Sequence, residues 1–140
     1  MLSIILALAP VIAPSPGGGI TINEIRVDQS GSDLDEYFEL IGPAGQSLDG
    51  LTYIVIGDGS GGSGVIESIS DLTGLAIPAD GNFLGGESSM TIAVPDATLS
   101  LGFENSDNVT HMLVSGFTGS SQEDLDTNDE IGRASCRERV

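Results

Sequence analysis

Residues 20–59 read ITINEIRVDQSGSDLDEYFELIGPAGQSLDGLTYIVIGDG, and the pattern of this stretch decides the fold class. Its apolar runs are rich in β-branched and aromatic residues, and Asp, Ser and Gly separate them. Phe38 and Leu40 fall on one side of the middle run, and this period of two is typical of a strand with one buried face. The stretch therefore predicts three β-strands, at residues 20–27, 37–41 and 51–57.

Short apolar runs of the same kind continue toward the C-terminus. They predict further strands at residues 64–69, 89–94, 97–103 and 109–114. Within the third of these, Ala97, Leu99, Leu101 and Phe103 share one face. No window carries a helical stripe of useful length, so about seven strands in one domain predict an all-β protein, a β-sandwich. The chain has no Trp, so we expect aliphatic side chains to fill most of its core.

The N-terminal residues are apolar. Residues 1–13, MLSIILALAPVIA, have the length of the apolar part of a secretory signal peptide and are too short for a membrane span. We expect a signal peptide here, followed by a flexible linker at residues 14–19. The alternatives are a first β-strand and an internal start in a fragment of a longer chain.

The C-terminal residues differ from the rest in composition. Three of the four basic residues, Arg133, Arg137 and Arg139, and the single Cys136 lie in the final stretch EIGRASCRERV. One back-translation of this stretch resembles the adapter ligated onto short-read sequencing libraries. We hypothesise that residues 131–140 are a non-native, adapter-encoded tail and that the gene was cut near Glu130, which would leave the sandwich truncated at its C-terminus. The alternative is a genuine basic tail.

Charge excludes several functions. The 140 residues contain 21 acidic and 4 basic residues, for a net charge of −17. Such a surface repels phosphates, which argues against contact with nucleic acid and against anionic membranes. One Cys cannot form a disulfide within the chain. Without residues 131–140 the only basic residue would be Arg26, and we expect a soluble acidic domain with no membrane span.

Several short motifs occur in a recognisable order. Ile22-Asn23-Glu24-Ile25 leads into an acidic loop, Glu36-Tyr37-Phe38-Glu39-Leu40 follows, and then Leu48-Asp49-Gly50-Leu51 and a segment from Ile77 to Phe83, IPADGNF. Over residues 20 to about 86 this series resembles the lamin-tail domain family. The glycine-rich insert at 57–64 and the last third of the chain depart from the family pattern.

The resemblance implies an immunoglobulin-like β-sandwich at residues 20–116, with a central strand after Phe83 and an acidic loop at residues 117–130. In bacteria such domains occur in secreted or surface proteins, alone or beside nucleases and phosphatases. The family has no shared catalytic residues, so none is carried over to this chain.

One acidic loop suggests a metal. Asp124, Asp126 and Asn128 alternate like the opening of a D-x-D-x-[DN] calcium loop, in which such residues supply oxygen ligands to Ca²⁺. Position six of the loop is Asp129 rather than Gly, and position twelve is Ser135, in the suspected tail. A solvated acidic loop is the favoured interpretation, with Ca²⁺ held by these residues as the alternative, so the sequence establishes no cofactor and leaves Ca²⁺ as the candidate.

For three other groups of residues, a structural role is a better interpretation than metal binding or catalysis. The acidic cluster at residues 32–36 suits turn capping better than metal binding. Glu24 and Glu39 suit a structural pair bridged by Arg26 better than acid–base catalysis. His111 has too few potential co-ligands for a zinc site, and we expect it to be a structural residue of a strand.

The sequence thus favours a secreted or cell-surface, non-enzymatic interaction module with an unknown protein or cell-surface partner. The alternative is the accessory N-terminal part of a truncated extracellular hydrolase, a nuclease or phosphatase, whose catalytic domain is missing.

Overall fold

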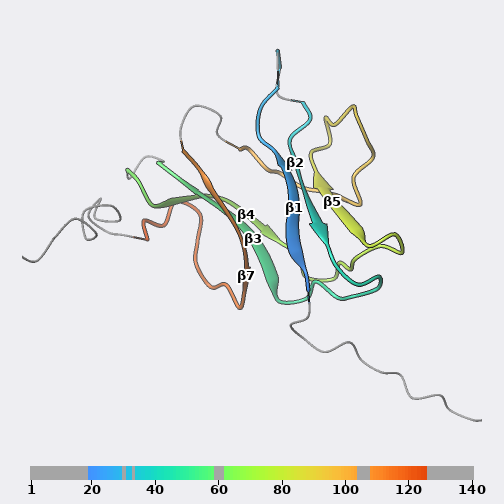
Figure 1. The fold of residues 1–140 in the computed structure, drawn as a ribbon. Coiled ribbons are helices and arrows are strands. Elements are labelled where there is room, and N and C mark those ends of the chain that lie inside the picture. Colours follow the sequence, from blue (N-terminus) through green and yellow to red (C-terminus); the bar gives the residue numbers. More distant parts are fainter. Residues whose placement is uncertain (1–18, 30, 33, 59–61, 104–107, 126–140) are drawn as a thin grey trace, which may run out of the picture.

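The computed structural model describes residues 19–29, 31–32, 34–58, 62–103 and 108–125. These residues form two β-sheets and no helix (Figure 1). The first sheet has the order β1-β2-β5-β6 and the second has the order β4-β3-β7. The strands are β1 (Thr21–Arg26), β2 (Tyr37–Ile41), β3 (Leu51–Gly57), β4 (Val65–Asp71), β5 (Asn82–Gly86), β6 (Ala97–Thr98) and β7 (Thr110–Ser115).

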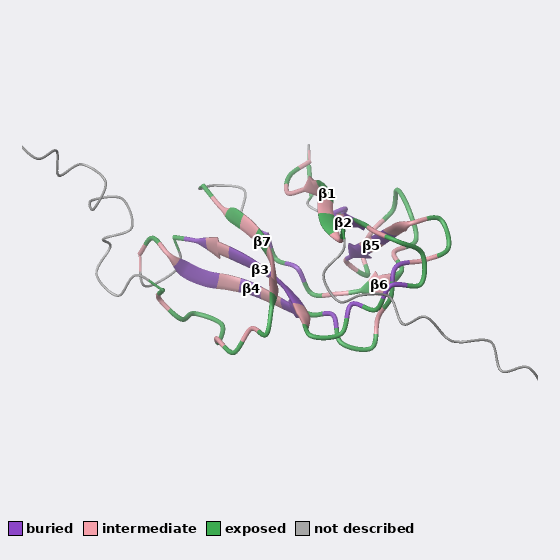
Figure 2. Cartoon of the chain, turned by 60° about the horizontal axis from the view of Figure 1, so that its bottom comes forward, coloured by how far each residue is buried: buried purple, intermediate pink, exposed green. Residues whose placement is uncertain are grey.

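Antiparallel pairing dominates both sheets. β1 pairs with β2 and β2 with β5, while β3 pairs with β4 on one side and with β7 on the other. Of the strands in the described residues, only β5 and β6 run parallel, over two residue pairs. Figure 2 shows the two groups of strands, and buried residues occur in both of them, in β2 and β5 of the first sheet and in β3 and β4 of the second. The described chain is therefore an all-β protein consistent with a β-sandwich, as the sequence predicts.

The core lies between the sheets. The alternation in β2 is confirmed, because Phe38 and Leu40 are fully buried. The Phe38 ring stacks on Tyr53 of β3 with centroids 3.8 Å apart, and Phe83 and Phe103 lie beside this pair. Aliphatic side chains surround these four rings: Leu40, Leu48, Val55, Leu72, Ile77 and Leu101. Although the core lacks Trp, its centre is aromatic.

One end of the sandwich is closed by two loops that pair with each other. Gly45 and Leu48 donate backbone hydrogen bonds to Ile77 and Leu75, and Ile77 donates one back to Gln46. The step from this loop into β3 is a tight turn, in which Leu51 N–H bonds the Leu48 carbonyl and Gly50 has a φ of +73°. Only Gly adopts that φ readily, which explains the Leu-x-Gly-Leu pattern physically.

The predicted strand at residues 89–94 is wrong. The N–H groups of Thr91 and Ile92 bond the Asp35 carboxylate instead of a neighbouring strand, and Val94 is 91% exposed. The strand that precedes this segment in the chain is β5. Strand propensity did not predict β5, because it contains Gly85 and Gly86 and glycine is rare in strands.

The predicted strand at residues 97–103 is longer than the observed one. Only Ala97 and Thr98 pair with β5. The predicted face is nevertheless real, since Leu101 and Phe103 are buried while Gly102 between them is exposed.

Candidate binding groove

The residues predicted to bind calcium are only partly described. Asp126 and Asn128 lie outside the described residues. Asp124 forms an isolated backbone bridge with Val65 of β4, so its chain segment runs along that strand. Among the described residues, no group of three His, Cys, Asp or Glu side chains is placed to hold a metal ion. The calcium site stays a prediction.

The acidic cluster before β2 caps a turn and a loop. Asp35 accepts hydrogen bonds from the N–H groups of Thr91 and Ile92 and from the Thr91 hydroxyl. The bond from the Thr91 N–H, against the opposing effect of burial, lowers the pKa of Asp35. The neighbouring Glu36 is buried and accepts a 2.9 Å hydrogen bond from the N–H of Phe103. Both carboxylates therefore hold later segments against the β1-β2-β5-β6 sheet.

Glu24 and Glu39 are paired across β1 and β2, as expected, but Arg26 does not bridge them. Within the described part of the chain, Arg26 donates to Gln29, 3.0 Å away. Tyr37 donates to Glu24 at 2.6 Å, and this bond raises the pKa of Tyr37. Asn23 donates to Glu39. Each of the two carboxylates therefore accepts a hydrogen bond from a neutral donor, which suits a structural role.

His111 lies in β7, as predicted, and faces the core. Its Nδ1 is 2.9 Å from the Tyr53 hydroxyl, and its ring lies edge-on to Phe103. Its Nε2 is buried without a hydrogen-bond partner among the described residues. Burial lowers the pKa of His111 and raises that of Tyr53, so both groups are neutral near pH 7.

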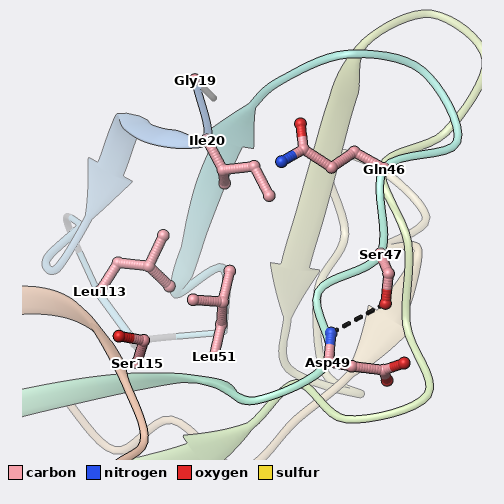
Figure 3. Close-up of a pocket in the computed structure, with 8 residues that line it drawn as sticks. All are labelled: Gly19, Ile20, Gln46, Ser47, Asp49, Leu51, Leu113 and Ser115. Atoms are coloured by element: carbon pink, nitrogen blue, oxygen red, sulfur yellow. Dashed lines mark hydrogen bonds between the residues drawn. The ribbon is translucent and has the colours of Figure 1, made fainter. Parts of the chain in front are cut away.

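A groove of about 450 Å³ opens where the two sheets part, between the start of β1 and the end of β7 (Figure 3). Ile20, Leu51 and Leu113 form its apolar wall, and all three are partly buried against the core. Polar residues complete the lining: Gln46, Ser47, Asp49 and Ser115. Apolar walls with a few placed polar groups are typical of binding sites.

Gln46 is the unusual residue of the groove. Its side chain is 8% exposed and extends toward Ile20 (Figure 3), and its Oε1 has no hydrogen-bond partner among the described residues. Its backbone is fixed on both sides, because Gln46 N–H bonds the Pro43 carbonyl and Ile77 N–H bonds the Gln46 carbonyl. A buried amide oxygen without a donor is costly. Figure 3 shows this oxygen turned away from Ile20 and the amide nitrogen turned toward it, so the amide presents its N–H groups on the groove side.

Asp49 places a negative charge at the rim. Its Oδ1 accepts a 2.7 Å hydrogen bond from the Gly74 N–H, and this bond is the main cause that lowers the pKa of Asp49. Its backbone N–H bonds the Ser47 hydroxyl, as Figure 3 shows. The charge of the nearby Asp71 acts in the opposite direction and raises the pKa of Asp49. The rim is therefore anionic at neutral pH and attracts cations.

Strand β7 borders the groove and forms an edge of its sheet. Gly116 N–H bonds the Gly50 carbonyl, so these two residues form a hydrogen-bonded pair. Hydrogen-bonded and non-hydrogen-bonded pairs then alternate along the antiparallel register of β7 with β3. This alternation directs the backbone N–H and C=O groups of His111, Leu113 and Ser115 away from β3. Within the described residues, no strand pairs with that outer edge.

The sequence interpretation missed this groove. Gln46 and Asp49 stand in a loop, PAGQSLDG, that reads as ordinary turn sequence. Nothing in a local pattern shows that Gln46 is buried, because its loop is held against residues 75–77, which lie far away in the sequence. The one available signal was the tight turn at Gly50, which fixes where the loop enters β3.

Comparison with known proteins gives no further guide to the groove: no protein-family model, no curated protein and no solved structure matches this chain. None of the described residues belongs to a helix long and apolar enough to cross a membrane.

Proposed function

We propose that the chain is a non-enzymatic interaction module of the lamin-tail type that works outside the cell or at its surface and binds a partner through the groove beside β7. The groove carries this proposal, because it combines an apolar wall with the Gln46 amide and the Asp49 charge. These groups recognise a ligand without any chemistry on it.

The strand arrangement supports an immunoglobulin-like variant of the sandwich. β1, β2 and β5 share one sheet, and β4, β3 and β7 share the other. In immunoglobulin-like domains, strands A, B and E share a sheet, and strands C′, C and F lie in the other in the same relative order. The lamin-tail motifs of residues 20–86 agree with this assignment, which belongs to the proposal.

A peptide selection tests the function. A random ten-residue peptide library displayed on phage is selected against the immobilised chain, and the enriched peptides are synthesised. They should bind the free chain and shift the NMR signals of Gln46, Leu51 and Leu113. Selection that yields no binder, or turnover of a chromogenic phosphodiester by the purified chain, would contradict the proposal.

A pair of variants locates the binding. Ser115→Trp fills the groove from an exposed position, and Ser100→Trp adds the same side chain at an exposed position that does not line the groove. The selected peptides should bind Ser115→Trp about tenfold more weakly or worse, since their apolar contact area is lost. They should bind Ser100→Trp like the unmodified chain.

A further inference from the structure

The outer edge of β7 and the groove together define one ligand. We infer that they bind an extended basic peptide, which adds to β7 as an antiparallel strand and places an aliphatic side chain in the groove. This inference rests on the proposed function and names the partner class of the same site. It follows from three features of the described residues: the direction of the free backbone groups, the position of Leu113 and the charge.

The free backbone groups set the register. His111, Leu113 and Ser115 direct N–H and C=O groups to the outer edge, so an added antiparallel strand would form its close hydrogen-bonded pairs opposite these residues. In such a pair the two side chains lie on the same face of the sheet. Because Leu113 lines the groove, the ligand residue opposite Leu113 also points into it.

The groove suits an aliphatic side chain at that position. Ile20, Leu51 and Leu113 would contact it, and Ile20 itself lies against Gly42 of the loop that follows β2. The Gln46 amide lies across the cavity from Leu113 with its nitrogen turned toward Ile20 (Figure 3), so it can donate a hydrogen bond to a carbonyl group of the ligand. A ligand strand with ordinary geometry can thus form backbone hydrogen bonds with β7 and place a side chain in the groove at the same time.

Charge selects a basic ligand and disfavours a second copy of the chain. Arg26 is the only Lys or Arg among the described residues, against a net charge of −17 for the whole chain. Asp49 at the rim is held in its charged form. Two copies would meet with like charges, whereas a lysine-rich strand gains attraction from the whole surface.

Synthetic peptides with alternating residues test the inference. The probe is Ac-Lys-Val-Lys-Val-Lys-Val-Lys with a dansyl label, and the matched control replaces every Lys by Glu. We expect the Lys peptide to bind in a fluorescence anisotropy titration with a Kd at least about tenfold lower than that of the Glu peptide. Its affinity should fall as NaCl is raised.

Backbone methylation tests the strand register. With Val opposite Leu113, the Val N–H groups face β7 and the Lys N–H groups face solvent. N-methylation of the Val residues should therefore weaken binding about tenfold or more, because each methyl group removes a hydrogen bond. N-methylation of the Lys residues should leave the Kd within about twofold. Ser115→Pro, which removes an outward N–H, should weaken binding more than Ser115→Ala.

The outcomes separate the two proposals. If methylation at Val and at Lys has equal effects while Ser115→Trp still abolishes binding, the groove function stands and the strand pairing is wrong. If no peptide binds, including those from the library, both proposals fall. If light scattering shows that the chain dimerises alone and that Ser115→Pro abolishes the dimer, the occupant is a second copy and the basic peptide is excluded.

Discussion

Gly85 shows why a residue that looks like a strand breaker lies in a central strand. An added Cβ would lie 2.6 Å from Cζ of Phe38 and 3.0 Å from Cδ1 of Leu99. The Phe38 ring cannot move aside easily, because it is fully buried and stacked on Tyr53. Glycine at this position is a packing requirement of the core.

Gly85→Ala should therefore lower the free energy of unfolding by about 1–3 kcal/mol through overpacking. Urea denaturation of the purified chain measures this change. In a Phe38→Leu background, the smaller side chain makes room for the methyl group, so the same substitution should cost less there. Equal costs in the two backgrounds would show that the ring is not the obstacle.

His111 should make stability depend on pH. Burial lowers its pKa below the ordinary value of 6.5, so the folded chain binds fewer protons than the unfolded chain below that pH. The stability that comes from the neutral ring is complete above pH 6.5 and is lost as the pH falls below it.

The melting temperature should consequently fall between about pH 7 and pH 5, and more steeply than in His111→Asn. Asn can still accept a hydrogen bond from Tyr53 and does not titrate. Parallel pH profiles of the two proteins would show that His111 does not titrate on unfolding.

At the scale of elements, carboxylates attach the irregular segments to the β1-β2-β5-β6 sheet. Glu36 precedes β2, and its bond to the Phe103 N–H fixes the segment that follows β6. Glu36→Ala should leave that buried N–H unsatisfied and cost about 1–3 kcal/mol of stability. Glu36→Gln keeps an acceptor oxygen, so it should cost less in the same denaturation experiment. Equal costs would assign the effect to the charge of Glu36.

Sequence predicted those elements whose signal is local. Strands β1, β2, β3, β4 and β7 begin and end within two residues of their predicted limits. The pattern of apolar runs missed β5, because Gly85 in it is required by the packing of Phe38, a residue far away in the sequence. Residues 89–94 have strand propensity, but Asp35 bonds their backbone. The groove escaped prediction for a similar reason, since β1, β3, β7 and a loop meet only in three dimensions.

For the whole molecule, repulsion among the acidic side chains should lower the stability of the folded state at low salt. The net charge is −17, and the described residues contain a single cationic side chain, that of Arg26. Raising NaCl from about 20 mM to about 500 mM should screen this repulsion and raise the melting temperature. KCl should act equally if general screening is responsible, and a melting temperature that is flat with both salts would contradict the prediction.

The segment after β7 has a consequence for how chains could join. Residues 122–125 return to β4 and bond Gly64 and Ile66, so one edge of this sheet is partly occupied, whereas no strand of the described residues pairs with the other edge, at β7. A sheet that is open on one side can receive one strand, but it does not readily offer the opposite side for the next addition. Strand addition at this sheet therefore ends with a discrete complex rather than a growing fibre.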